Sequence, residues 1–436
     1  MKDDKYFLSY KNQPGLVLKK NEKDIDMEPK VSIITSYYNA KRYMWQTLNC
    51  VLNQTFPFWE WIIVDDGSIN KEDIEYLDEL KKIDNRIIIL RKENEGLAKG
   101  RDYAIKYAST NYILPLDADD LIEPTYIETL YCTLETNLDA SWAFTNSLGF
   151  GKYRYITDEL FDSDIMKNRN QITATALIRK EKILEIGGYG VAKRYVNEDW
   201  HLWLRMLARG NYPVQATYYG FWYRRRENSL LSEVNDEKRK ENELRLRDLK
   251  IEAGKIKNRI LSVVYPNELE SKNLEYNKLD FNDLKFINNK DGILYIISEF
   301  GFNRKMTKEI KKNSIQNDIY IVSLENSKKS QYANRQNIEK YATAYNLSSF
   351  LDEKYFLGFI EYIINTRNIK KVFISNKCKA KEKITKNLYS FEYIKYANNN
   401  LLYFLNILKY KFSKFIVIRA IRKILRNIII KERMEY

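Results

Sequence analysis

The sequence predicts an α/β protein whose two domains, each with a mostly parallel sheet, are joined by a charged helical linker. In the first half, apolar strand-like segments alternate with helical segments, a pattern typical of βαβ units with right-handed crossovers. The chain has 436 residues, which is too long for one ordinary core. A second alternation begins near residue 292, after a segment dense in charged residues. These three observations predict the two-domain α/β architecture.

The spacing of apolar residues places the individual elements. In the first domain we expect strands at Val31–Thr35, Trp59–Val64, Arg86–Leu90 and Asn111–Pro115, and helices at Tyr43–Asn53, Lys71–Lys82 and Leu97–Ala108. In the second we expect strands at Gly292–Ile297, Asp318–Val322 and Lys370–Ser375, and a helix at Tyr355–Thr366. The expected boundaries are an N-terminal tail at 1–29, the first domain at 30–232, the linker at 233–285, the second domain at 286–400 and a basic amphipathic helix at 401–436.

Composition and charge narrow the class of partner. A formal net charge of +14 suits nucleic acid, an anionic membrane or phosphorylated small molecules. The N-terminal half has no zinc finger, RNP aromatic signature or basic recognition helix, so we exclude nucleic acid. The 3 cysteines lie far apart without metal-binding spacing, which favours a reducing cytoplasm. We expect a soluble or peripheral protein, because the start lacks the pattern of a secretory signal and no apolar run approaches about 20 residues.

Polar and acidic residues follow three of the expected strands in the first domain. Ser36–Asn39, Asp65–Ser68 and Asp117–Asp120 each come directly after a strand. Ligands of parallel sheets bind beyond the carboxyl ends of the strands, so these segments should open onto one crevice. Carboxylates crowded at a strand end repel one another unless a cation or a ligand's hydroxyl groups offset the cost. Taken singly, Asp120 could cap a following helix and Asp65–Ser68 could be a turn.

The N-terminal half resembles family 2 glycosyltransferases of the GT-A fold, over about residues 30 to 230. The segments that carry the resemblance are Val31–Asn39, Asn53–Phe56, Val64–Ser68, Asn94–Arg101 and Asp117–Asp120, followed by Gly187–Tyr189 and Asn197–Arg205. They occur in the order and spacing of that family. The last two resemble its acceptor-side segment.

The resemblance implies how the donor is held. Asp119 would ligate a Mn²⁺ or Mg²⁺ ion that bridges the diphosphate of a nucleoside-diphosphate sugar, while Asp117 would lie beside the ribose and the donor sugar. Oxygen ligands suit such hard cations. Ser36, Tyr38 and Asp66 match the positions that hold the nucleotide base, with Tyr38 stacking on it and Asp66 accepting from a ring N–H.

Further site residues follow from the same resemblance. Lys99 and Arg101 open a helix beside the donor, although the neighbouring Asp102 stands where the family more often has Asn. Arg226 lies in the loop after the last strand, where His is frequent, and retains a positive charge for the leaving diphosphate. Asp199 would be the general base that deprotonates the acceptor hydroxyl in an inverting reaction. Alternatively, Lys99 and Arg101 could be solvated surface charges, Arg226 could belong to a basic surface turn, and Asp199 could cap a helix.

The second half carries no such motifs. Residues 290–400 weakly resemble one Rossmann-like half of a GT-B glycosyltransferase without its nucleotide-binding half, which favours an acceptor-binding or partner-binding module. Within 401–436, basic residues and apolar residues fall on separate faces of an expected helix. Such a helix can lie on an anionic membrane surface, and docking on a neighbouring domain or subunit is the alternative.

Taken together, these features predict an inverting, metal-dependent glycosyltransferase. It would move a sugar from a nucleoside-diphosphate sugar to a hydroxyl of a glycan, lipid-linked or protein-linked acceptor in surface polysaccharide or glycoconjugate synthesis. We expect it in the cytoplasm, at the inner face of the cell membrane. A non-catalytic glycan-binding or scaffold protein is the alternative, and sugar-phosphate nucleotidyltransferases are disfavoured because Ser36–Asn39 replaces their phosphate loop after the first strand.

Overall fold

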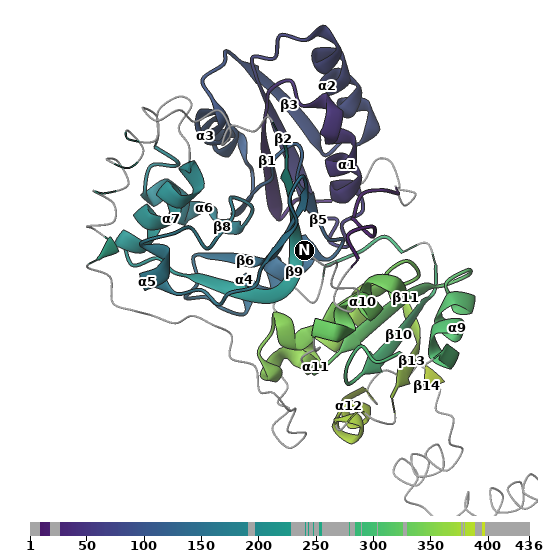
Figure 1. Cartoon of the computed structure of the whole chain (residues 1–436). Helices are drawn as coiled ribbons and strands as arrows, with labels where there is room; N and C mark the ends of the chain where they lie inside the picture. Colours follow the sequence, from purple (N-terminus) through teal and green to yellow (C-terminus); the bar gives the residue numbers. More distant parts are fainter. Residues whose placement is uncertain are drawn as a thin grey trace, which may run out of the picture.

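The protein forms two α/β domains that stand side by side (Figure 1). The computed structural model describes residues 9–17, 27–190, 197–227, 284–288, 290–302, 304–325, 329–375, 378, 380–388 and 395–396, with isolated positions between 240 and 279. Most of the expected linker and the whole expected C-terminal helix at 401–436 lie outside this part of the chain. Within the described residues, no helix combines the length and the apolar character that crossing a bilayer requires.

The N-terminal domain is built on a nine-stranded sheet with the order β3-β2-β1-β4-β8-β6-β9-β5, and β7 pairs with β6. Its strands are β1 Val31–Tyr37, β2 Trp59–Asp66, β3 Ile87–Lys92, β4 Tyr112–Pro115, β5 Leu121–Ile122, β6 Trp142–Gly151, β7 Tyr155–Thr157, β8 Leu177–Arg179 and β9 Pro213–Arg225. Its helices are α1 Lys41–Leu52, α2 Lys71–Ile83, α3 Leu97–Tyr107, α4 Tyr126–Glu135, α5 Ser163–Met166, α6 Lys180–Glu185 and α7 Glu198–Ala208.

Helices cover both faces of this sheet. Strands β1 and β2 are almost wholly buried, as expected for parallel strands that have helices on both sides. One face packs on α1, α2 and α4, and the other packs on α3, α6 and α7. Because β2, β1 and β4 are adjacent and parallel, their carboxyl ends meet at one edge of the sheet. The mostly parallel α/β class predicted from the sequence is confirmed.

The C-terminal domain has a parallel five-stranded sheet with the order β12-β11-β10-β13-β14. Its strands are β10 Gly292–Ile297, β11 Asp318–Ser323, β12 Thr343–Asn346, β13 Ile369–Ile374 and β14 Lys395–Tyr396. Its helices are α9 Arg304–Asn313, α10 Lys329–Ile338, α11 Phe356–Thr366 and α12 Lys381–Leu388, with short 3₁₀ turns at Leu347–Ser349 and Glu353–Tyr355. This is the Rossmann-like arrangement expected from the alternation of strands and helices.

The predicted capping role of Asp120 is wrong. The residues that follow it form the short strand β5, which pairs antiparallel with β9, and the next helix begins only at Tyr126. The buried Asp120 carboxylate instead accepts a hydrogen bond of 2.7 Å from the backbone N–H of Arg224 on β9. Asp120 therefore fixes the end of β9 beside the acidic run.

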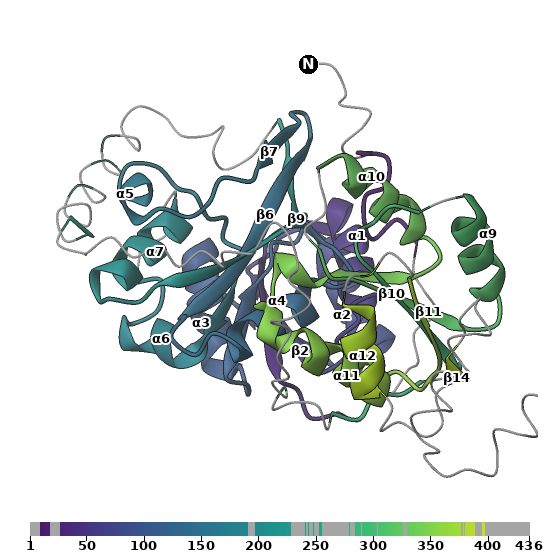
Figure 2. The same cartoon turned by 90° about the horizontal axis from the view of Figure 1, so that it is seen from below.

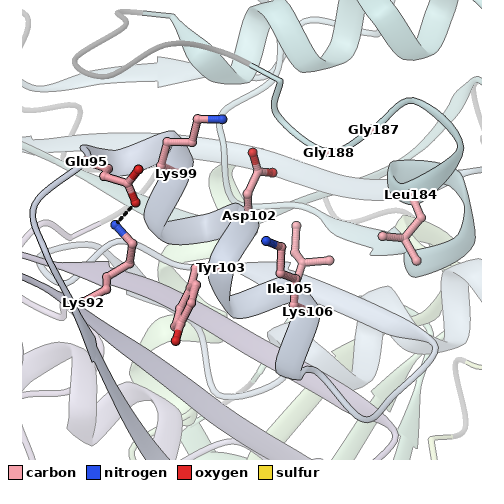
Figure 3. Close-up of a pocket in the computed structure, with 10 residues that line it drawn as sticks. All are labelled: Lys92, Glu95, Lys99, Asp102, Tyr103, Ile105, Lys106, Leu184, Gly187 and Gly188. Carbon is pink, nitrogen blue, oxygen red and sulfur yellow. Dashed lines mark ion pairs between the residues drawn. The ribbon is translucent and has the colours of Figure 1, made fainter.

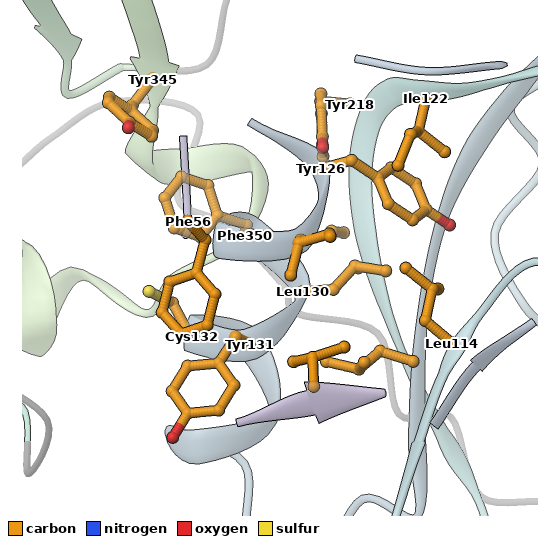
Figure 4. Close-up of a cluster of buried hydrophobic side chains, with 14 of the residues drawn as sticks. Phe56, Leu114, Ile122, Tyr126, Leu130, Tyr131, Cys132, Tyr218, Tyr345 and Phe350 are labelled. Carbon is orange, nitrogen blue, oxygen red and sulfur yellow. The ribbon is translucent and has the colours of Figure 1, made fainter. Parts of the chain in front are cut away.

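The two domains share a buried interface around α4. Figure 4 shows Tyr131 and Cys132 of α4 beside Phe56 from the N-terminal domain and Phe350 from the C-terminal domain. These apolar residues belong to one continuous core that extends from the first sheet to the second. Seen from below in Figure 2, α4 lies next to α11. The domains therefore share one core, while each also has a buried cluster of its own.

A fully buried carboxylate, that of Glu128 on α4, lies in this interface. It accepts hydrogen bonds from Tyr345 at 2.5 Å and Tyr362 at 2.7 Å, both in the C-terminal domain. Arg367 forms an ion pair with it at 2.5 Å, and Thr55 donates its hydroxyl at 2.5 Å. Four donors from both domains thus satisfy one buried charge, as burial of an ion requires.

Part of the expected N-terminal tail also contacts both domains. The described residues 9–17 include Gly15, whose carbonyl accepts from Asn49 of α1 at 3.0 Å. The backbone N–H of Ser9 donates to Gln336 of α10 at 2.7 Å. The ring of Tyr10 lies edge-on to Trp222 of β9, with centroids 5.9 Å apart. This segment therefore lies against both domains.

Candidate active site

A cleft with a volume of about 380 Å³ lies beyond the carboxyl end of β4. The acidic run after β4 forms one wall, and the end of β9 forms another. The start of α7 and the segment Asn170–Thr175 complete the lining. Residues more than 100 positions apart in the sequence therefore meet where the topology of a parallel sheet places its ligand.

In the acidic run, Asp119 and Asp120 are buried, whereas the side chain of Asp117 is 27% exposed. Asp119 is 9% exposed, and burial raises its pKa to about 6, with the charge of Asp117 adding to the effect and Arg226 opposing it. Burial and the two neighbouring carboxylates raise the pKa of Asp120 well above its usual range. Positive charge nearby therefore favours the ionised forms of Asp119 and Asp120.

Two arginines at the end of β9 supply positive charge to the acidic run. Arg226 forms an ion pair with Asp119, with 2.7 Å between Nε and Oδ2. Arg224 donates from Nε to the backbone carbonyl of Asp119 at 2.6 Å, and its guanidinium lies over the rings of Tyr43 and Phe150. Both arginines line the cleft, and Arg226 is half-buried there. Arg224 is also fixed by a hydrogen bond to the side-chain oxygen of Gln46.

A buried arginine connects the acidic run with the start of α7. Arg101 donates to Asp117 at 2.6 Å and to Glu198 at 2.8 Å, and its side chain is 1% exposed. Its guanidinium lies 5.4 Å from the ring centroid of Tyr189. Arg101 therefore is no surface charge, and both of its terminal nitrogens already contact carboxylates of this chain.

The proposed base Asp199 lines the cleft next to Glu198. Its Oδ1 accepts from the backbone N–H of Trp200 at 2.7 Å, and its Oδ2 accepts from Asn170 at 3.0 Å. Desolvation, and then the negative charge of Glu198, raise the pKa of Asp199 to about 7. A carboxyl group that titrates near neutral pH is well suited to accept a proton from a hydroxyl group.

Of the residues predicted to hold the nucleotide base, Ser36 and Asp66 lie beside α3 or its first turn. Tyr38 is 47% exposed, so its ring is available for stacking. Ser36 is half-buried and lies so close to Gly100 that a Cβ there would come within 2.1 Å of the Ser36 hydroxyl. Asp66 is buried, and its carboxylate accepts from Lys92 and from the backbone N–H groups of Glu95 and Gly96. The structure therefore gives Asp66 three partners within the protein.

Lys99 does not line the cleft that contains the acidic run. It lines a second hollow of about 340 Å³ between α3 and the segment after α6 (Figure 3). There Asp102 points toward Gly187 and Gly188, and it accepts from the backbone N–H of Tyr189 at 2.8 Å. The carboxylate at position 102 thus anchors the acceptor-side segment that the sequence analysis singled out.

Three side chains of this region were not predicted from the sequence. Asn170 donates a hydrogen bond to Asp199, and Glu198 forms an ion pair with Arg101. Arg224 donates a hydrogen bond to the backbone carbonyl of Asp119. The run of three arginines at 224–226 was a usable signal for Arg224, and the acidic pair at 198–199 was one for Glu198. Asn170 lies in a segment with no distinctive pattern, so only the fold reveals it.

The donor atoms around Asp119 are compatible with a divalent cation. Among the described residues, no group of three or more His, Cys, Asp or Glu side chains is placed to hold a metal ion. Mg²⁺ commonly uses only one or two protein carboxylates and completes its coordination with substrate phosphates and water. A buried carboxylate beside a second one, with a raised pKa, is a site where added positive charge is stabilising. Asp119 therefore fits as a protein ligand of an ion shared with a diphosphate.

The mostly parallel sheet and the acidic cleft at the carboxyl ends of its strands define a GT-A-like glycosyltransferase domain. Comparison with known proteins agrees. The family model "Glycosyl transferase family 2" matches residues 32–200. The putative teichuronic acid biosynthesis glycosyltransferase TuaG of Bacillus subtilis is 32% identical over 194 residues, which cover 42% of this chain and 74% of TuaG. The chain belongs to glycosyltransferase family 2, as its motifs predicted, and is a glycosyltransferase.

Two further matches each cover about half of this chain. Glycosyltransferase GlyA of Streptococcus pneumoniae is 28% identical over 223 residues, which cover 47% of this chain and 32% of GlyA. The crystal structure of S. aureus TarS residues 1–349 in complex with UDP-GlcNAc aligns with 52% of this chain and 67% of that chain, at 18% identity and a TM-score of 0.44.

Proposed function

We propose that this enzyme transfers a sugar from a nucleoside-diphosphate sugar to an acceptor hydroxyl with inversion at the anomeric carbon. The observation that carries the proposal is the convergence of Asp117 and Asp119 with Arg226 and Asp199 around one cleft. Cationic groups on one side can take up the charge of a leaving diphosphate, and a carboxyl group on the other can take up a proton.

The chemistry follows from these positions. Asp199 accepts the proton of the acceptor hydroxyl, and the oxygen attacks the anomeric carbon in line with the departing diphosphate. The new C–O bond forms as the bond from carbon to phosphate oxygen breaks, and that bond's electron pair leaves with the nucleoside diphosphate. Arg226 stabilises the negative charge that develops there. A single displacement of this kind inverts the configuration of the carbon.

The donor and the metal occupy the side of the acidic run in this proposal. Asp119 would hold a Mn²⁺ or Mg²⁺ ion, which when bound supplies Lewis-acid stabilisation of the diphosphate. Asp117 lies next to the sugar and ribose, while Tyr38 stacks on the base. Ser36 and Asp66 complete the donor-side set, with Asp66 shaping the loop before α3 through its backbone partners. Lys99, which lines the other hollow, is not part of this set.

The name of TuaG supports a place in the synthesis of a cell-surface polysaccharide or glycoconjugate. The acceptor would be a hydroxyl of a glycan, a lipid-linked or a protein-linked molecule. The basic residues of 401–436 would hold the enzyme at the cytoplasmic face of the membrane. We expect the full chain to co-sediment with anionic vesicles but not with neutral vesicles, and we expect this binding to be lost when 401–436 are deleted. Undiminished binding by the deletion variant would contradict the proposal.

The direct test is turnover of nucleotide sugars. A panel of UDP-, GDP- and dTDP-linked sugars is screened by thermal shift with and without Mn²⁺, because a ligand that binds only the folded state raises its apparent stability. Release of nucleoside diphosphate from the best donor is then measured for the wild type and for Asp119→Asn. We expect the metal-dependent shift and the turnover to be lost in the variant. Metal-independent turnover at the wild-type rate in Asp119→Asn would refute the role of Asp119.

A further inference from the structure

The buried guanidinium of Arg101 joins the two halves of the cleft. Its Nη2 contacts Asp117, which follows β4 on the donor side, at 2.6 Å. Its Nη1 contacts Glu198, the first residue of α7 and the neighbour of Asp199, at 2.8 Å. One side chain thus holds two carboxylates that are 81 positions apart, since 198 − 117 = 81.

The surroundings of Arg101 leave it little freedom to bind a ligand directly. The side chain is 1% exposed, and the ring of Tyr189 lies 5.4 Å from its guanidinium carbon. A guanidinium has five N–H donors, and the buried Nε of Arg101 has no hydrogen-bond partner among the described residues. Because the side chain is only 1% exposed, a diphosphate could reach these donors only if the packing around the guanidinium opened.

The start of α7 depends on this contact for its position. Asn197, which precedes the helix, has a left-handed backbone with φ of 62°, and it makes no side-chain capping bond to α7. The N-cap residue therefore supplies no side-chain acceptor, and the local restraint on the first turn is the bond from the N–H of Trp200 to Asp199. Glu198 is 9% exposed, so its pairing with Arg101 ties the first turn of α7 to the strand end that bears Asp117.

We propose that Arg101 and Glu198 are positioning residues that hold Asp199 at a fixed distance and angle from the donor bound beside Asp117. This inference rests on the proposed transfer reaction, because it assigns no contact with substrate to either residue. A planar guanidinium can grip two carboxylates at once, whereas the ammonium of lysine is a point charge on a flexible stem. Arginine at this position is therefore required for geometry and not only for charge.

The test separates positioning from donor binding. Arg101→Lys retains the charge, and Glu198→Gln retains the size and one acceptor oxygen. For both variants we expect kcat for donor hydrolysis to fall by about 10- to 100-fold, since a displacement of about 1 Å costs that much in rate. Donor affinity, measured by calorimetry with the best nucleotide sugar of the panel, should change by less than about threefold. The double variant should lose no more kcat than the worse single variant, because both changes break one unit.

The chain offers a matched control in Arg86. This arginine is also buried, forms an ion pair with Asp84 at 2.6 Å and stacks on Trp59, but it lies at the amino end of β3, away from the cleft. Arg86→Lys should reduce stability to a similar degree and leave kcat within about twofold of the wild type. Activities are compared at a temperature where circular dichroism shows every variant fully folded.

Each outcome is informative. A loss of donor affinity in Arg101→Lys with kcat unchanged would make Arg101 a donor ligand and overturn the proposal. Unchanged kcat and affinity in both variants, or additive losses in the double variant, would also overturn it. Failure of the wild type to bind or turn over any nucleotide sugar would instead count against the proposed function, so the two failures are distinguishable.

Discussion

Replacing Glu128 by alanine is expected to lower the free energy of unfolding of the full chain by about 3–5 kcal/mol. The substitution leaves the guanidinium of Arg367, which is 3% exposed, without its carboxylate in the interface. Arginine cannot escape this cost by losing its proton. The hydroxyl groups of Tyr345 and Tyr362 lose their acceptor as well. Breaking a buried ion pair from one side is therefore much more costly than removing a surface charge.

The distribution of tryptophan allows a sharp measurement of this effect. All 7 tryptophans lie between Trp45 and Trp222, so tryptophan fluorescence reports on the N-terminal domain alone. Urea unfolding of Glu128→Ala should shift to a lower midpoint by this probe. Arg367→Ala, a change in the C-terminal domain, should shift the same fluorescence transition by a similar amount, because the shared core makes the domains unfold together.

Glu79→Ala is the matched control for Glu128→Ala. Glu79 pairs with Lys82 at 2.7 Å on the exposed surface of α2, where an ion pair contributes at most about 1 kcal/mol. If the tryptophan fluorescence of Arg367→Ala gave the same urea midpoint as that of Glu79→Ala, the C-terminal domain would unfold independently of the N-terminal domain. The double variant Glu128→Ala with Arg367→Ala should recover part of the loss, because it removes both buried charges.

Local patterns were sufficient to predict the α/β class and the βαβ units over residues 31–115, but they did not place β5 to β8, β12 or β14. The strand at Gly292–Ile297 has the expected bounds, and the strands predicted from Val31 and Trp59 begin where expected and extend two residues further. Runs of apolar residues that are buried on both sides carry this signal without any tertiary information. The short strand β5 carries no such signal, since its two residues pair with Phe221 and Trp222 about a hundred positions later. The misassignment of Asp120 as a helix cap follows from that non-local pairing.

The interface between the domains was beyond such patterns. On the sequence, Glu128 is one acidic residue in a helix, where a charge is normally solvated. Its partners Tyr345, Tyr362 and Arg367 lie more than 200 positions away and in another domain. The expectation of an accessory binding module for residues 286–400 stays a proposal, and the shared core adds that this domain also supports α4.

In the candidate site, too, some features could be predicted from the sequence and others could not. Asp117, Asp119 and Asp199 lie in motifs that are recognisable one by one, and the fold brings them to one cleft. The contacts that set their chemistry come from elsewhere in the chain, such as Asn170 on Asp199 and Arg226 on Asp119. Motifs therefore identify the reacting groups, while their pKa values depend on neighbours that only the tertiary structure reveals.

Replacing Asp199 by asparagine is expected to reduce kcat by about 10²- to 10⁴-fold, the usual contribution of a general base. Asparagine has nearly the same shape and can still accept from Asn170, but it cannot take up the proton of the acceptor hydroxyl. Donor affinity should remain close to that of the wild type, because Asp199 lies on the acceptor side. Asp352→Asn, a change at an exposed capping carboxylate of the C-terminal domain, is the control and should leave kcat unchanged.

The pH profile tests the same assignment independently. Because Asp199 must be ionised to act, kcat/KM should be constant above its pKa of about 7 and should fall about tenfold for each pH unit below it. Burial and Glu198 raise this pKa, while the N–H of Trp200, Arg101 and Asn170 lower it. Asn170→Ala removes a hydrogen bond that favours the carboxylate, so its acidic limb should shift to higher pH. An acidic limb near pH 7 that persisted in Asp199→Asn, or stayed in place in Asn170→Ala, would assign the titrating group to another residue.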